Sequence, residues 1–212
     1  PSSYILIDNE YENDGDYFTT GLNTMRLTLA HEFFHAVQAA YRSKNPGDEY
    51  FYEMLGMWME DIIVPDGNDY IYWVDEFYIA PTTIFEETNG YSVASFGHYL
   101  NVMVEDIAEV NLTDNELIRN IWETLEYSHV NPKVLLNNEL ISNYSSTFME
   151  CWSDFIARNY FNGIDSQFYY HLDQALMQSM SGTYPTTIYS NFSQNMYLTN
   201  DIISLSAIKT NL

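Results

Sequence analysis

Apolar side chains recur along much of this chain every three or four positions, which is the spacing of one face of an α-helix. The first segment with this spacing is expected to begin near Asn23 or Thr24, either of which can cap a helix, and to end before Asn45. Its predicted buried stripe comprises Met25, Leu29, Phe33, Val37 and Ala40. A second, more polar stripe comprises Thr28, His31, His35 and Gln38. The pattern therefore predicts that the two histidines lie away from the apolar face.

A second helix is predicted from about Phe51 to Ile63, because its apolar positions also follow helical spacing. That apolar stripe comprises Leu55, Trp58, Met59 and Ile62. Another face of the same helix carries Glu53, Gly56 and Glu60, which are again three or four positions apart. Two carboxylates and a glycine are thus expected to point toward whatever packs against that face.

The rest of the chain is also mainly helical in pattern. Helices are predicted within 93–107, 113–125 and 146–161, and the last two open with the capping-box sequence Thr-x-x-Glu. Residues 70–79 are rich in aromatic side chains and fit either a strand or a helix. Residues 4–7 (Tyr-Ile-Leu-Ile) form a short run typical of a β-strand. We therefore expect an α+β, mostly helical fold with a small N-terminal sheet, in a single domain over residues 1–212.

Composition narrows the classes of partner. The chain has 212 residues, of which 46% are hydrophobic, so it can bury a sizeable core. Its 30 acidic and 7 basic residues give a net charge of −23, which makes nucleic acid and anionic membrane surfaces unexpected partners. No apolar run is long enough to span a membrane, and the one cysteine excludes an internal disulfide. Because the chain begins at Pro1 instead of Met, we expect it to be a piece of a longer precursor.

The predicted first helix contains the sequence His31-Glu32-Phe33-Phe34-His35. Residues four apart stand on one helix face, so His31 and His35 can present two imidazoles to one metal ion. Glu32 lies about 100° around the helix, where it can reach a water on that metal. A catalytic zinc needs a third protein ligand, and Glu53 follows His35 by 18 positions, enough for a second helix to return across the first. Gly56, one turn later, would let the two helices approach closely.

These motifs give the chain a family resemblance. His31–His35 followed by residues 53–60 (Glu-Met-Leu-Gly-Met-Trp-Met-Glu) resembles the gluzincin clan of zinc metallopeptidases, which includes thermolysin. More narrowly, it is similar to a family of secreted bacterial metalloproteases with the motifs H-E-F-F-H and E-G-x-A-x-W-M-E. Recurring pieces of that family also match at Tyr91, 99–100, 121–123 and 159–163. The sequence departs from the pattern at three positions: Met54 replaces Gly, Gly56 replaces Ala, and Met57 stands where thermolysin has Asp.

The resemblance implies a zincin-like, thermolysin-like domain holding one catalytic Zn²⁺ on His31, His35 and Glu53. It implies that Glu60, or Asp61 in its place, supports a ligand from behind, since metal-bound imidazoles usually donate their second N–H to such a group. Glu32 would be the general base, and Tyr91 would stabilise the oxyanion, although a packing role for Tyr91 is the alternative. The expected function is hydrolysis of peptide bonds in peptide or protein substrates outside the cell, in a secreted protein whose oligomeric state is open. Residues 4–7 would be an edge strand for an extended substrate.

Other interpretations are also open. A catalytically silent module that binds extracellular protein or glycan is the main alternative, and the intact Glu32 argues against it. Residues 8–16 are acidic and could hold Ca²⁺, but their spacing matches no known calcium loop, so a solvated turn is favoured. The remaining histidines, which are His98, His129 and His171, are expected to be structural or exposed. Cys151 lies among apolar residues and is predicted to be a buried, inert thiol.

Overall fold

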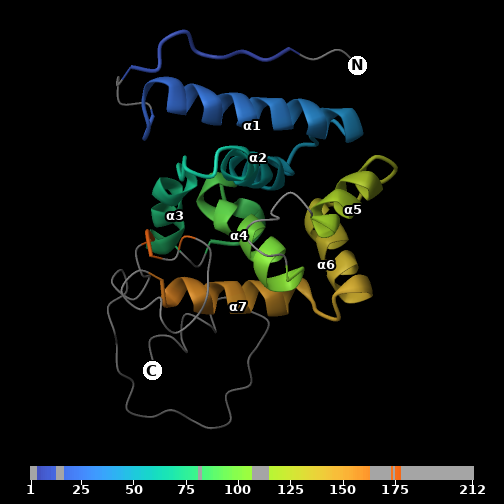
Figure 1. The fold of residues 1–212 in the computed structure, drawn as a ribbon. Coiled ribbons are helices and arrows are strands. Elements are labelled where there is room, and N and C mark those ends of the chain that lie inside the picture. The colour runs from blue at the N-terminus through green and yellow to red at the C-terminus, as the bar shows by residue number, and fades with distance from the viewer. Residues whose placement is uncertain are drawn as a thin grey trace.

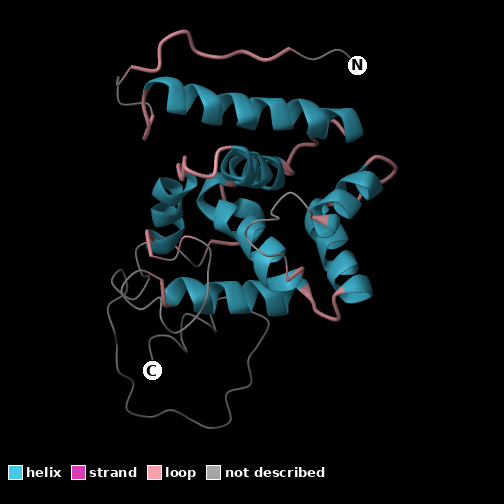
Figure 2. Ribbon diagram, viewed as in Figure 1, coloured by secondary structure: helices cyan, strands magenta, loops and turns pink. Residues whose placement is uncertain are grey.

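The computed structural model of the protein describes residues 4–12, 17–80, 83–106, 115–162, 173 and 175–177. Over these ranges every regular element is a helix (Figure 2). The α-helices are α1 (Gly21–Tyr41), α2 (Glu49–Ile63), α3 (Tyr70–Ile79), α4 (Ala94–Tyr99), α5 (Glu116–Leu125), α6 (Pro132–Asn143) and α7 (Phe148–Tyr160). Short turns of other helix types are η1 (Phe85–Glu87), η2 (Tyr91–Val93) and the π-helical η3 (Leu100–Val104).

Helix α2 is the central element of this arrangement. In Figure 1, α1 lies along one side of α2, α3 and α4 lie on the other side, and among the described helices α7 lies farthest from α1. Helices α5 and α6 pack against each other beside this stack. Most of α2 is buried, including Leu55 and Trp58, which have no exposed surface. A helix enclosed in this way holds its polar side chains in fixed positions.

The expected N-terminal sheet is wrong for the described part of the chain, and with it the α+β fold class. Residues 4–12 run as an irregular segment beside α1 instead of forming a strand (Figure 1). The amide of Gly21 donates to the carbonyl of Tyr11 at 2.7 Å, which fixes one end of the segment. A strand needs a neighbouring strand to take up its backbone hydrogen bonds, and no described segment provides one. Tyr4 and Leu6 are accordingly 83% and 76% exposed.

The predicted buried face of α1 is also wrong. Leu29 and Phe33 are 42% and 56% exposed, whereas His31 is only 5% exposed. The residues that α1 buries are Thr24, Leu27, Ala30, His31, Phe34 and Gln38. Part of the polar stripe therefore faces α2, and it can be buried there because its polar atoms find hydrogen-bond partners.

Several other predicted elements are confirmed. Helix α7 begins with the expected capping box, in which the Thr147 hydroxyl accepts from the Glu150 amide and the Glu150 carboxylate accepts from the Thr147 amide. Residues 70–79 form helix α3, which decides between the two structures that the sequence allowed. The sequence pattern did not predict α6, although Asn131 caps it and Pro132 occupies its first turn, both of which are helix-start signals. The predicted cap at Thr113 lies outside the described residues, and α5 begins at Glu116.

None of the helices over the described ranges combines the length and apolar character needed to cross a lipid bilayer.

Candidate metal centre

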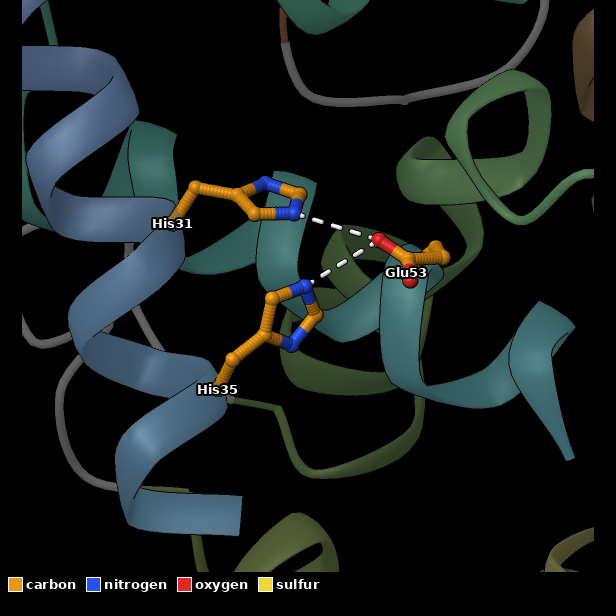
Figure 3. A group of neighbouring side chains, drawn as sticks. All are labelled: His31, His35 and Glu53. Carbon is orange, nitrogen blue, oxygen red and sulfur yellow. Dashed lines mark hydrogen bonds and ion pairs between the residues drawn. The ribbon is translucent and has the colours of Figure 1, made fainter. Parts of the chain in front are cut away.

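Two histidines from α1 and one glutamate from α2 meet at a single point. The Nε2 atoms of His31 and His35 lie 3.2 Å and 3.1 Å from the same oxygen, Oε2 of Glu53 (Figure 3). The three potential ligand atoms all lie within 4.8 Å of one another. The convergence that the sequence spacing predicted is therefore present in the fold.

The outer ring nitrogens of both histidines are fixed by acceptors. His31 Nδ1 lies 2.7 Å from Oε1 of Glu60, and His35 Nδ1 lies 2.6 Å from Oε1 of Gln38. Gln38 in turn donates through its amide nitrogen to the carbonyl of Tyr52, on α2, at 3.1 Å. With Nδ1–H donating outward in this way, each Nε2 would be available to a metal ion at the shared point, as a metal-binding imidazole requires.

The close approach of α1 and α2 depends on Gly56. A Cβ atom added at this position would lie 2.8 Å from Cε1 and 2.9 Å from Nε2 of His31, which is too close for a real contact. The prediction that Gly56 permits the approach is thus confirmed. Gly90 acts similarly on the other side of the site: its φ of 86° favours glycine, and a Cβ there would lie 2.7 Å from Cβ of Glu53.

Tyr91 lies directly over the cluster. Its hydroxyl donates to Oε2 of Glu53 at 3.1 Å, and its ring stacks on the His31 imidazole with centroids 5.7 Å apart. The Trp73 ring also stacks on the Tyr91 ring, with centroids 5.1 Å apart. Burial raises the pKa of Tyr91, and the negative charges of Glu53 and Glu32 raise it further. Tyr91 therefore keeps its proton at neutral pH and remains a hydrogen-bond donor.

The electrostatics of the cluster favour a bound cation. Burial disfavours a charged His31, but Glu53 and Glu60 outweigh this effect and raise its pKa to about 9. Burial likewise opposes ionisation of Glu53, yet hydrogen bonds from His31 and His35, with help from Lys44, lower its pKa below the usual range. In the absence of a metal, the site thus holds a proton on His31 beside an ionised Glu53. A divalent cation can take the place of that proton.

The donor set fits zinc. Two imidazole nitrogens and one carboxylate oxygen are the ligands of the thermolysin-type catalytic zinc site, which keeps a further position open. The side chains of His35 and Glu53 are 24% and 16% exposed, so two of the three candidate ligands reach the surface in part. Among the described residues, this is the one group of His, Cys, Asp and Glu side chains that meets the distance requirement for a metal ion.

The remaining predicted residues are placed as follows. Glu32 follows His31 on α1 and is partly exposed, close enough for its charge to act on Tyr91. His98 is fully buried, His129 is exposed, and His171 lies outside the described residues. Cys151 is confirmed as a buried free thiol whose pKa is raised by burial.

The acidic segment at 8–16 is described only in part, since residues 13–16 lie outside the described ranges. In the described portion, Asp8 accepts hydrogen bonds from the Glu10 amide at 3.1 Å and from the Tyr17 hydroxyl at 3.4 Å. These contacts give no support for a calcium ion.

Two residues of the site were not predicted from the sequence. Gln38 orients His35, and its position three residues later on the same helix face was a usable signal. Lys44 contacts Oε1 of Glu53 at 3.1 Å from the connection between α1 and α2. No sequence pattern predicts the contact between Lys44 and Glu53, because it depends on how the connection is folded.

Comparisons of this chain with models of known protein families, with curated proteins and with solved structures give no match. The resemblance to zinc metallopeptidases therefore stays a prediction from the sequence motifs.

Proposed function

We propose that this protein is a zinc-dependent metallopeptidase of the gluzincin type, which hydrolyses peptide bonds in peptide or protein substrates. The observation that carries this proposal is the convergence of His31 Nε2, His35 Nε2 and Glu53 Oε2, with both outer imidazole nitrogens already fixed by acceptors. A histidine pair that only filled the core would not need both Nε2 atoms beside one oxygen of a partly exposed glutamate.

Different residues around the site are suited to different roles in the hydrolysis. A zinc ion held by the three ligands would supply Lewis-acid chemistry, polarising a carbonyl and making water more acidic. Glu32 is suited to accept the proton of the attacking water and to pass it to the leaving nitrogen, because its partly exposed carboxylate follows His31 on α1. Tyr91, which keeps its proton, is a donor for the oxyanion that develops on the carbonyl.

The test is metal content and cleavage measured on the same preparations. We expect about one zinc per chain in the wild-type protein by elemental analysis, and cleavage of casein or a quenched peptide library that a chelator abolishes. Glu53→Ala should lose both zinc and cleavage. Glu32→Gln should keep zinc and lose cleavage. A matched control is Glu86→Gln, which removes a carboxylate paired with Lys133 outside the metal centre and should change neither property.

Each result separates the candidate functions. Wild-type protein without zinc would overturn the proposal. Zinc without cleavage, together with unchanged properties of Glu32→Gln, would instead favour a module that binds protein or glycan and performs no chemistry.

A further inference from the structure

The two oxygens of Glu53 have different partners. Oε2 lies within 3.2 Å of both Nε2 atoms and accepts from Tyr91, whereas Oε1 accepts from the ammonium group of Lys44 at 3.1 Å. The chain has only seven lysines and arginines against 30 acidic residues, so few of its carboxylates can have a basic side chain as a partner. One of these few basic side chains, Lys44, lies beside Glu53, the proposed metal ligand.

The connection that carries Lys44 is tied down at both ends. Arg42, at the end of α1, forms an ion pair with Asp48, at the start of α2, and the two side chains are only 9% and 7% exposed. Arg42 also donates to the carbonyls of Ser128 and Val130 at 3.0 Å and 3.1 Å. This ion pair therefore fixes the backbone of the loop that carries Lys44, although the Lys44 side chain itself is 41% exposed.

We infer that Lys44 is a positioning residue that keeps Glu53 a one-oxygen ligand. This inference rests on the proposed function, because it assumes a zinc ion on Oε2. A carboxylate can bind a metal through one oxygen or two, and a second oxygen would take the position that a catalytic zinc leaves open for water or substrate. The Lys44 ammonium, a compact charge with three donors, engages Oε1 and holds it away from that position.

The test reads the metal coordination directly. Zinc-loaded wild-type protein, Lys44→Met and Lys44→Arg are compared by X-ray absorption spectroscopy, by zinc affinity in competition with a chelator, and by peptide cleavage. The control is Lys133→Met, which removes a lysine–glutamate ion pair of comparable exposure that lies outside the metal centre.

We expect Lys44→Met to gain about one oxygen in the first coordination shell, to bind zinc at least as tightly as the wild type, and to cleave roughly 10-fold more slowly, a loss typical of residues that position a metal ligand. Lys44→Arg should restore the wild-type coordination and most of the cleavage, and Lys133→Met should match the wild type. A merely structural role would instead lower zinc affinity and cleavage together.

Unchanged coordination in Lys44→Met, or a parallel fall in affinity and cleavage, overturns the inference and leaves the proposed function standing. Wild-type protein that binds no zinc overturns both. Because coordination is measured without substrate, the inference holds if the wild type binds zinc and the coordination changes as expected, even when no cleaved substrate has been found.

Discussion

Two neighbouring acidic residues on α2 each face a buried histidine, and the surroundings of the two pairs differ. Glu60 Oε1 lies 2.7 Å from Nδ1 of His31, and Asp61 Oδ2 lies 3.3 Å from Nε2 of His98. Successive residues of a helix point about 100° apart, so α2 directs Glu60 toward α1 and Asp61 toward α4. One helix thus builds two carboxylate–histidine pairs on two of its sides.

Only the pair on the α1 side extends into a ligand cluster. His31 continues through Nε2 to Glu53, beside a second histidine four residues later. His98 is fully buried, with the Tyr70 ring 4.9 Å from its own, and it belongs to no metal-capable group among the described residues. The comparison teaches that a histidine beside an acidic side chain occurs both in this fold's core and in the candidate metal centre. What distinguishes the metal centre is the convergence of free donor atoms from two helices.

The strongest test of this difference removes each histidine in turn. His31→Ala should reduce zinc affinity by more than ~100-fold and abolish cleavage, since loss even of a supporting residue costs a metal site ~10–100-fold. His98→Ala should retain zinc but lower the free energy of unfolding by ~2–4 kcal/mol, because it leaves a cavity and removes the histidine partner of the buried Asp61 side chain. Chelator competition and urea denaturation measure the two quantities. Zinc loss in both variants would end the distinction between the pairs.

The two carboxylates offer a second test. Glu60→Gln keeps an acceptor for His31 Nδ1 but removes the charge, and we expect zinc affinity to fall ~10-fold. Asp61→Asn should leave the affinity within ~2-fold of the wild type, because its side chain faces His98 instead of a proposed ligand. Equal losses of zinc affinity in the two variants would show that the total negative charge of α2 matters, and not the direction in which each side chain points.

A third test compares alanine substitutions at two glycines, which change the packing beside each histidine's helix without changing any charge. A Cβ at Gly56 would meet the His31 ring at 2.8 Å, and a Cβ at Gly97 would meet the Trp58 ring at 2.7 Å. Both alanine variants should lose ~1–3 kcal/mol of unfolding free energy from overpacking. Only Gly56→Ala should also weaken zinc binding, several-fold, because it displaces a ligand. Thermal unfolding and calorimetric titration with zinc provide the readouts, and weaker zinc binding in Gly97→Ala would contradict the assignment.

A further expected effect concerns pH. Burial raises the pKa of Asp61 to about 8, with further contributions from the negative charges of Asp173 and Glu60, against ~3.9 in an unfolded chain. The folded state therefore holds this proton more tightly, so the contribution of Asp61 to stability is greatest below pH ~4 and is lost as pH rises toward ~8.

His98 and Glu60 also lie near Asp61, so the informative quantity is the difference between wild type and Asp61→Asn. Urea unfolding of metal-free protein at several pH values should show a smaller loss of stability with rising pH in Asp61→Asn than in the wild type. Parallel curves would mean that Asp61 is ionised at its ordinary pKa in the fold.

Local sequence determined much of this protein. The spacing of apolar residues predicted most of the helices, because each side chain's direction on a helix follows from its position alone. Thr147 and Glu150 predicted the start of α7, since the capping box is completed within four residues. The spacing of His31, His35 and Glu53 anticipated their convergence, because two short helices joined by a tight connection have few ways to pack.

Only the tertiary structure decided which face of α1 is buried. By sequence, Leu29 and Phe33 mark the apolar face, yet they are exposed, while His31 and Gln38 are buried. Burying polar atoms is favourable only when distant residues supply their hydrogen bonds, and here Glu60 and the Tyr52 carbonyl do so from α2.

The same reason accounts for the strand that was predicted at residues 4–7 and for the unpredicted contact of Lys44 with Glu53. A strand is stable only beside a partner, and an ion pair across a loop exists only once the loop is folded. The sequence by itself predicted most of the helices and the three side chains that meet at the candidate metal centre. Their burial, and the partners that orient them, depended on contacts between segments far apart in the chain.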